Sequence, residues 1–452
     1  MTNFKIKPSA YSFQSFLKYH VNGGMLLMIV ALLAMIVANS PLSDEYLSLW
    51  NYTVSLQIGD FNLFSHHGEP MTLMTFINDA LMAIFFFSVG LEIKREVLVG
   101  ELSSFRQALL PILAACGGMV VPVVIYLLLI PGGGSAHNGL AIPMATDIAF
   151  SIGVLSLLGK RVPLSLKIFL TAFAVVDDIG GIIVIALFYA TNLELGYLLV
   201  AVAILVMLFF ANNKLNVVNK AFYIFWGIVV WYLFLQSGIH STVAGVLVAF
   251  TIPSRPHLKI GRFIERIREN IQSFPVSEKD SIILEKEQLE RLKSLESASD
   301  HVISPLQSME DALQAPVNYF IMPLFAFANA GVVLSGGGPE IIGDVTYAVV
   351  LGLLLGKFIG IFSFTWLTVK LKIASLPEGM CWKNLAGVSM LGGIGFTVAL
   401  FIANLSFGTA EPALLNQAKL GIICGTVLSG IIGYLYLKKI LPKENQIDMA
   451  ND

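Results

Sequence analysis

The chain has 452 residues, of which 56% are hydrophobic and 13% are charged, and its formal net charge at pH 7 is -2. Soluble domains carry about a quarter charged residues, so this composition indicates an integral membrane protein. The balanced charge argues against a nucleic-acid partner. The three scattered cysteines, Cys116, Cys381 and Cys424, lack metal-binding spacing and indicate small buried thiols.

The first apolar run extends from about Met25 to Val37 and follows three lysines. This order is also typical of a signal peptide with a cleavage site near 38–40. A retained membrane span is favoured, because eleven further spans follow.

A spanning helix needs roughly 20 predominantly apolar residues. The segments that qualify are 22–40, 72–91, 107–130, 139–158, 166–189, 194–211, 219–234, 238–253, 312–332, 346–369, 384–405 and 413–437. We therefore expect an all-α polytopic membrane protein with twelve transmembrane helices. Eight lie in 1–253 and four in 309–440, with a connector over 254–308 and a tail over 441–452.

The basic residues alternate between the two sides of these spans. Lysine and arginine are absent from 41–70, 131–138, 190–193, 235–237, 333–345 and 406–412, and nearly all of them fall in the other connections. The positive-inside rule then places both termini in the cytoplasm. We expect a multi-pass protein of the bacterial inner membrane, with the lipid bilayer as its surroundings.

Two hydrophilic segments interrupt the pattern. Residues 53–65 alternate apolar and polar on both sides of Gly59-Asp60, which predicts a periplasmic β-hairpin. A lone hairpin is marginally stable, so it either pairs with a second subunit in a homodimer or packs on its own loops.

The connector 254–308 is the second hydrophilic segment. Isoleucines and Phe263 at helical spacing, with arginines between them, predict an amphipathic helix on the membrane surface. Ser277 and Asp280 suggest a capping box for a second helix that extends to about Ser297. A solvated connector is the alternative.

Five ionisable residues lie deep in the expected spans: Asp79, Asp147, Asp177, Asp178 and Lys357. A charge at the bilayer centre costs at least about 2.5–3.5 kcal/mol, so an ion or proton pathway is the default interpretation. Neutralisation of one acid by Lys357 is the simpler alternative, but it leaves the second acid of the adjacent pair and Asp147 unexplained.

Asp177 and Asp178 are adjacent and near mid-span. Neighbouring helical residues point about 100° apart, so one of them can pair with Lys357 while the other faces a water-filled cavity. Two adjacent carboxylates in a low dielectric disfavour double ionisation. A carboxylate can hold a proton or a hard cation such as sodium, but not both, and this competition is sufficient for an antiporter.

Two spans contain residues that break helices. Pro143 precedes Thr146 and Asp147 in one, and Gly392, Gly393 and Gly395 interrupt the other. Interruptions at corresponding places in two halves point to a binding site between inverted repeats, here near 107–189 and 346–437. We expect Asp147 to offset the N-terminal ends of the half-helices and Lys357 the C-terminal ends.

The order of several motifs resembles the NhaA family of sodium/proton antiporters over most of the chain. The matching stretches are Asn78-Asp79-Ala80-Leu81-Met82, Gly90-Leu91-Glu92-Ile93-Lys94-Arg95-Glu96, 141–150, Arg161-Val162-Pro163 through Asp178, Ser237-Gly238-Ile239-His240, 323–331, Gly356-Lys357 and 392–397. That family is an established example of inverted repeats. The connector 255–303 is longer than the family's usual one.

The resemblance implies roles for individual residues. Asp178 is implied as the main sodium/proton carboxylate, with Asp177 paired to Lys357, and Thr146 and Asp147 at the helix crossing. The implied sodium ligands are Asp178, Asp177 and Thr146. The positions tied to pH response are Glu92, Glu96, His240 and Glu310, the last resting only on its distance from Pro323. The hairpin matches a dimer contact, and the transported ions are sodium, lithium and protons, with no cofactor.

Two other functions fit a buried acid pair. An intramembrane aspartyl protease needs its aspartates on different helices, with a Gly-x-Gly-Asp motif that this sequence lacks, and no Gly-x-Ser-Gly serine site occurs either. A channel would conduct without coupling to protons. Together with the resemblance, which implies the pH regulation, the sequence predicts an electrogenic sodium(lithium)/proton antiporter that works by alternating access, and not an enzyme.

Overall fold

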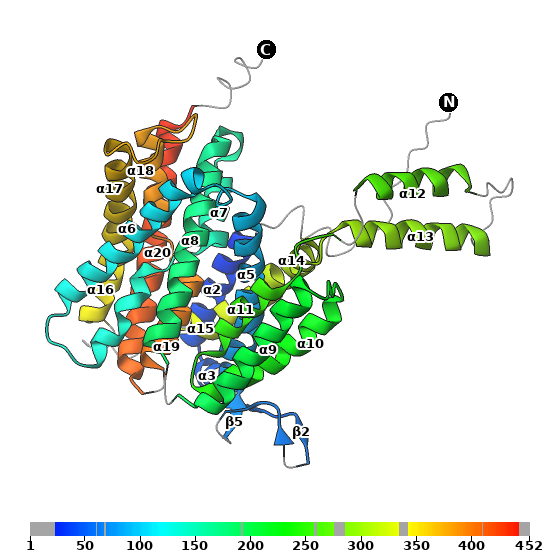
Figure 1. Ribbon diagram of the computed structural model, residues 1–452. Coiled ribbons are helices and arrows are strands. Elements are labelled where there is room, and N and C mark those ends of the chain that lie inside the picture. The colour runs from blue at the N-terminus through cyan, green and yellow to red at the C-terminus, as the bar shows by residue number, and fades with distance from the viewer. Residues whose placement is uncertain are drawn as a thin grey trace.

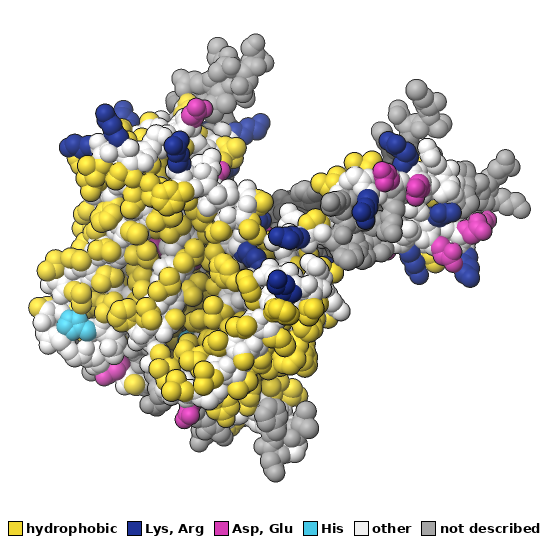
Figure 2. Space-filling view, viewed as in Figure 1, with side chains coloured by type: hydrophobic (Ala, Val, Ile, Leu, Met, Phe, Trp, Pro, Cys, Tyr) yellow, Lys and Arg dark blue, Asp and Glu magenta, His cyan; other side chains and the backbone are white. Residues whose placement is uncertain are grey.

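The computed structural model describes residues 23–59, 61–66, 69–190, 193–256, 260–274, 285–333, 342–408 and 410–442. Long helices run side by side in one bundle, with short strands at one end (Figure 1). Apolar side chains cover the flank of this bundle, and lysines and arginines gather at the end opposite the strands (Figure 2). We call these two ends the hairpin end and the basic end.

The first half of the bundle contains α2 (Gly23–Ala38), α3 (Ser43–Leu49), α4 (Leu73–Phe76), η1 (Ile77–Leu81), α5 (Met82–Val99), α6 (Phe105–Leu129), η2 (Ser135–Met144), α7 (Ile148–Ser156), η3 (Gly159–Arg161), α8 (Leu164–Phe188), α9 (Leu195–Asn213), α10 (Lys220–Ser237) and α11 (Ser241–Thr251). The remainder contains α12 (Ile260–Gln272), α13 (Lys286–Val302), α14 (Pro305–Pro316), η4 (Val317–Ile321), α15 (Met322–Asn329), α16 (Asp344–Leu351), η5 (Gly352–Gly356), α17 (Lys357–Lys370), α18 (Trp382–Leu391), α19 (Phe396–Phe407) and α20 (Pro412–Ile440).

By length and composition, seven described helices can cross a membrane, or up to ten if each of three bent pairs counts as one span. The other two expected spans correspond to α11, an apolar helix of 11 residues, and to the run from α14 to α15. The protein is thus a mostly helical, multi-pass membrane protein.

Two bent pairs lie where Pro143 and the glycine run predicted interruptions. The axes of η2 and α7 meet at 42°, and those of α18 and α19 meet at 44°. The first half of the first pair is a 3-10 helix, which the sequence did not predict. The third pair, α2 and α3, turns by 117°.

Three helices contain a π-helical turn: η1 precedes α5, η4 precedes α15, and η5 precedes α17. Such turns are rare and frequently lie at functional sites. Here η1 contains Asp79, and η5 ends one residue before Lys357.

Helices α6 and α17 cross in close contact at Gly117 and Gly360. A Cβ atom on Gly360 would lie 2.1 Å from the Gly117 carbonyl oxygen, so no larger residue fits there. Because Lys357 lies one helical turn before Gly360, this crossing fixes the position of the lysine.

The strands are short. β1 (Thr53–Val54) and β4 (Ser65–His66) pair antiparallel with β5 (Glu69–Thr72), and β2 (Gln57–Ile58) pairs with β3 (Phe61–Asn62). Gly59 has a φ of +62°, as a tight turn requires, and Asp60 lies outside the described residues. The side-chain amide of Gln236 in α10 donates a hydrogen bond to the Ser65 carbonyl at 2.8 Å, which joins the strands to the bundle.

Helices α12 and α13 extend away from the bundle (Figure 1). Ile260, Ile264 and Ile271 of α12 are exposed, as the amphipathic pattern predicted. The suggested capping residues Ser277 and Asp280 lie outside the described residues. The capping box in the structure is formed by Glu285 and Gln288, and α13 continues past Ser297 to Val302.

The tail 441–452 is described only to residue 442, and the lysines that precede the first span are also outside the described residues. The expectation of three buried thiols is wrong. Cys381 and Cys424 are exposed on the surface of the bundle, and only Cys116 is partly buried.

Candidate functional site

Asp177 and Lys357 form a salt bridge in the interior. Asp177 is the fourteenth of the 25 residues of α8, and Lys357 begins α17. The Lys357 Nζ atom lies 2.7 Å from Asp177 Oδ2, and both side chains are 0% exposed. The ammonium also lies 5.6 Å from the centre of the Phe173 ring. Because a buried charge is costly, each of the two charges requires the other.

Asp178 points elsewhere. It is buried, and it contributes to the wall of a cavity of about 350 Å³ that the Asp177 side chain does not line. This is the split that helical geometry predicted for adjacent residues. One carboxylate is paired, and the other faces a space that water can enter.

Asp147 holds the two helix starts that meet at the interruptions. Its Oδ1 accepts a hydrogen bond from the Phe150 amide at 2.9 Å, which caps α7. Its Oδ2 accepts from the Thr397 amide at 3.1 Å and from the Thr397 hydroxyl at 2.5 Å, which holds the start of α19. A carboxylate satisfies free amides and offsets the positive end of a helix dipole, as the sequence predicted.

The helix ends at the crossing have different partners from those expected. The Thr146 hydroxyl donates to the Gly392 carbonyl at 2.9 Å, and the Ser151 hydroxyl donates to the Leu391 carbonyl at 3.2 Å. Lys357 was expected to offset these C-terminal ends, but its ammonium bonds Asp177. Uncharged hydroxyls satisfy the carbonyls, so the lysine charge stays with the carboxylate.

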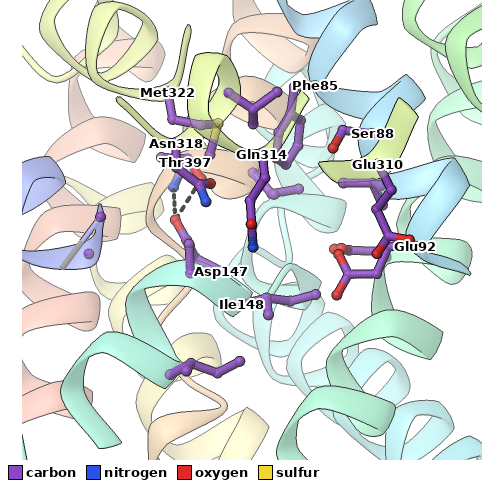
Figure 3. Close-up of a pocket in the computed structure, with 18 of the residues that line it drawn as sticks. Phe85, Ser88, Glu92, Asp147, Ile148, Glu310, Gln314, Asn318, Met322 and Thr397 are labelled. Atoms are coloured by element: carbon purple, nitrogen blue, oxygen red, sulfur yellow. Dashed lines mark hydrogen bonds between the residues drawn. The ribbon is translucent and has the colours of Figure 1, made fainter. Parts of the chain in front are cut away.

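The cavity extends from this crossing toward the basic end. Figure 3 shows Asp147 bonded to Thr397 on one wall and Glu92 with Glu310 on the opposite wall, with Gln314 between them. Arg95 binds Glu310 at 2.9 Å and Glu96 at 3.0 Å. Three of the four residues assigned to pH response therefore form one cluster near the cavity mouth.

His240 and Asp79 lie apart from that cluster. Their side chains pair with each other, with His240 Nε2 3.1 Å from Asp79 Oδ1. Asp79 lies in η1 and precedes Glu92 of α5 by 13 residues, which is about 20 Å of helix toward the hairpin end. Asp79 was expected to be a buried acid, but it is only partly buried, and it forms one unit with His240 on the hairpin side of the helix crossing.

Several residues of the site were not singled out from the sequence. Thr397 was noted only within the glycine run, although its hydroxyl makes the shortest bond to Asp147. Ser151 has no charge and belongs to no motif that would mark it. Arg95 was quoted in a motif, but only its two glutamate partners reveal its place in the cluster.

The sodium ligands expected from the resemblance are close to one another. Asp178 and Thr146 line the same cavity, and Asp177 directly precedes Asp178 in the chain. Within the described ranges, three or more His, Cys, Asp or Glu side chains do not gather as a metal site would require. Sodium would therefore depend on hydroxyl or carbonyl oxygens beside the two carboxylates.

Comparison with known proteins decides the family. The description Na+/H+ antiporter 1 matches residues 14–437. The chain belongs to this family of antiporters, which includes NhaA. It is 65% identical over 446 residues to the Na(+)/H(+) antiporter NhaA of Phocaeicola vulgatus, covering 98% of this chain and 99% of that one.

Two further relatives bear the same name. The NhaA of Bacteroides thetaiotaomicron is 59% identical, with 95% of this chain and 97% of that one covered. The NhaA of Helicobacter pylori is 45% identical, with 94% of each covered. A solved structure, the sodium proton antiporter MjNhaP1 from Methanocaldococcus jannaschii at pH 8, gives a TM-score of 0.46 at 12% identity, over 93% of this chain and 92% of that one.

Proposed function

We propose that this protein is an electrogenic sodium(lithium)/proton antiporter that exports sodium in exchange for protons moving inward. The observation that carries the proposal is the division of the two adjacent carboxylates. Asp177 is neutralised by Lys357, while Asp178 faces the cavity. A free carboxylate at the end of a water-accessible cavity can hold either a proton or a sodium ion.

Competition at Asp178 supplies the coupling. When the cavity contains sodium, the carboxylate releases its proton and binds the cation, with Asp177 and Thr146 supplying further oxygens. When it faces the other side, a proton displaces the sodium ion. Because one site serves both ions, neither crosses without the other.

Lys357 supplies the second proton. If Asp177 turns to sodium, the buried ammonium of Lys357 loses the carboxylate that it is bonded to and releases a proton. More than one proton then moves for each sodium ion, and the cycle transfers net charge. This is the reason for proposing electrogenic exchange.

Alternating access is proposed to take place at the interrupted helices. We infer twelve spans with inverted repeats near 107–189 and 346–437, whose interruptions cross beside Asp147. We infer that the half-helices tilt there, with side chains satisfying their free ends. We infer that the cavity of about 350 Å³ gives access from the basic end.

The orientation in the membrane is proposed from the distribution of basic residues, and the oligomeric state from the hairpin. We propose that the basic end faces the cytoplasm of a bacterial inner membrane, with both termini there. The hairpin 53–65 is proposed to join two copies into a dimer. We also propose that Glu92, Glu96, Glu310 and His240 regulate exchange by pH.

A flux experiment tests this function. In reconstituted vesicles with a proton dye and a voltage dye, sodium and lithium gradients should drive proton movement and a membrane potential, and potassium serves as the comparison ion. A silent potential would refute electrogenic exchange. Sodium flux without proton movement would indicate a channel, and Asp178→Asn vesicles give the background.

A further inference from the structure

Helix α19 lies between two cavities. At its start, Thr397 and Val398 line the cavity that contains Asp178. At its end, Leu405 and Ser406 line a second cavity of about 330 Å³ near the hairpin end, together with Tyr189. The residues between, Ala399 to Ala403, are fully buried. This stretch of α19 therefore separates the two spaces.

Three asparagines hold that stretch to the neighbouring helices. Asn404 Nδ2 donates to Asn329 Oδ1 at 2.8 Å, and Asn329 Nδ2 donates to Asn78 Oδ1 at 3.0 Å. They come from α19, from the end of α15 and from η1, and Asn329 is fully buried. Each donor amide also bonds the carbonyl four residues earlier, that of Phe325 or Leu400. We call this chain of side chains the asparagine clasp.

An aromatic contact lies one turn away on the same face of α19. Phe401 packs on Phe86 at 5.4 Å and on the His240 ring at 5.1 Å, measured between ring centres. His240 in turn pairs with Asp79, the neighbour of Asn78 in η1. Asn78 and Asp79 are adjacent in η1, and each is linked to α19 through one other side chain. Asn78 is linked through Asn329, and Asp79 is linked through His240.

We propose that the asparagine clasp closes the hairpin side of the transport site, and that Asn329 is its central positioning residue. The proposal rests on alternating access as proposed above. For Asp178 to face the hairpin end, α19 must move relative to η1 and α15, so the clasp must open. Amide pairs suit this role, since water can replace each bond once the helices part.

The strength of one such bond sets the size of the effect. A neutral hydrogen bond changes an equilibrium by about fivefold. Removing a clasp bond should therefore raise the population open toward the hairpin end by about that factor. A second substitution in the same clasp should add less than the first, because both remove the same contact.

Thiol labelling measures this population in the full-length protein. Cys116, Cys381 and Cys424 are changed to Ser, and Ala403→Cys, a buried position beside the clasp, reports access to a membrane-impermeant maleimide. Asn404→Leu, which keeps the volume but removes one clasp bond, should raise the labelling rate from the hairpin side about fivefold. Asn329→Ala removes both clasp bonds and should raise the rate further. Asn212→Ala is the matched control, since its amide bonds the Thr251 carbonyl near the basic end.

The apparent sodium affinity, measured separately from each side, distinguishes an opened clasp from a damaged fold. A larger hairpin-open population strengthens the apparent affinity for sodium added at that side by the same factor. Damage to the fold weakens affinity on both sides. If the clasp variants exchange ions but show the parent's maleimide labelling rate and apparent sodium affinity, the proposal that the clasp closes the hairpin side is wrong. If the parent itself does not exchange, the proposed function is wrong instead.

Discussion

Lys357 Nζ lies 2.7 Å from Asp177 Oδ2 at the centre of the bundle, and both side chains are fully buried. This bond divides the pair: Asp177 is joined to a buried ammonium, and Asp178 faces the cavity. A similar division could be drawn from helical spacing, but only the structure shows which of the two acids faces the cavity.

Asp178→Asn should insert and fold as the parent does, yet lose sodium/proton exchange by at least a hundredfold. The amide keeps the shape of the side chain but cannot release a proton or neutralise sodium. Proton flux in vesicles measures the loss, and Asp344→Asn, at the exposed start of α16, is the control. Exchange retained at normal sodium affinity would remove Asp178 from its central role.

Lys357→Ala should destabilise the protein strongly, because it leaves the Asp177 carboxylate buried without a partner. Breaking a buried pair in this way costs about 3–5 kcal/mol. Adding Asp177→Asn removes the stranded charge and should restore much of the loss. Thermal unfolding in detergent measures both variants, and two independent, additive losses would contradict the pairing.

The same double variant tests the second proton. Without a buried ammonium, fewer protons should accompany each sodium ion, so the membrane potential generated per sodium should fall. A potential unchanged from the parent, in protein that still exchanges, would place the second proton on another group.

Thr397→Val should weaken exchange at the crossing, and Thr397→Ser should restore it. The valine has the same shape but loses the 2.5 Å hydroxyl bond to Asp147, while the backbone bond remains. A hydrogen bond to a charged group contributes about 1.5–3 kcal/mol. A tenfold or larger fall in exchange rate is therefore expected for the valine alone, and equal activity of both variants would show that the hydroxyl is dispensable.

The fold was largely predictable from sequence because apolar length, basic residues and helix breakers are local signals. Pro143 and the glycine run indicated both interruptions before any geometry was known. The π-helical turns were not predictable. Nothing in the sequence of Ile77–Leu81 or Gly352–Gly356 indicates hydrogen bonds between residues five apart, as in a π-helix, instead of four apart, as in an α-helix.

Hydroxyl caps and amide pairs were missed for another reason. Ser151, Thr397 and Asn329 are uncharged, and an uncharged polar residue in a span costs little enough to need no special explanation. Charges such as Asp147 stand out in a membrane sequence, whereas the groups that bond them depend on contacts between segments about 250 residues apart.

Glu310→Gln should shift the activation of exchange toward higher pH. Its ion pair with Arg95 exists only when the carboxylate is deprotonated, and burial raises the pKa of Glu310, so the pair is present at high pH and is lost as pH falls. Glutamine imitates the low-pH form at every pH. A partly exposed ion pair contributes about 0.2–1 kcal/mol, so the shift should be up to about 0.7 of a pH unit with an unchanged maximal rate.

His240→Gln should move the same profile while leaving the maximal exchange rate unchanged. His240 Nε2 lies 3.1 Å from Asp79 Oδ1, and its Nδ1 accepts a hydrogen bond from the Thr242 amide, so the ring joins η1 to the start of α11. Glutamine lacks the ring geometry that makes both contacts at once, so η1 and α11 lose part of this contact. Proton flux measured across a pH series in vesicles, with His137→Gln in η2 as control, checks the shift. If His240→Gln leaves the profile where the parent has it, the pair serves only to hold η1 against α11.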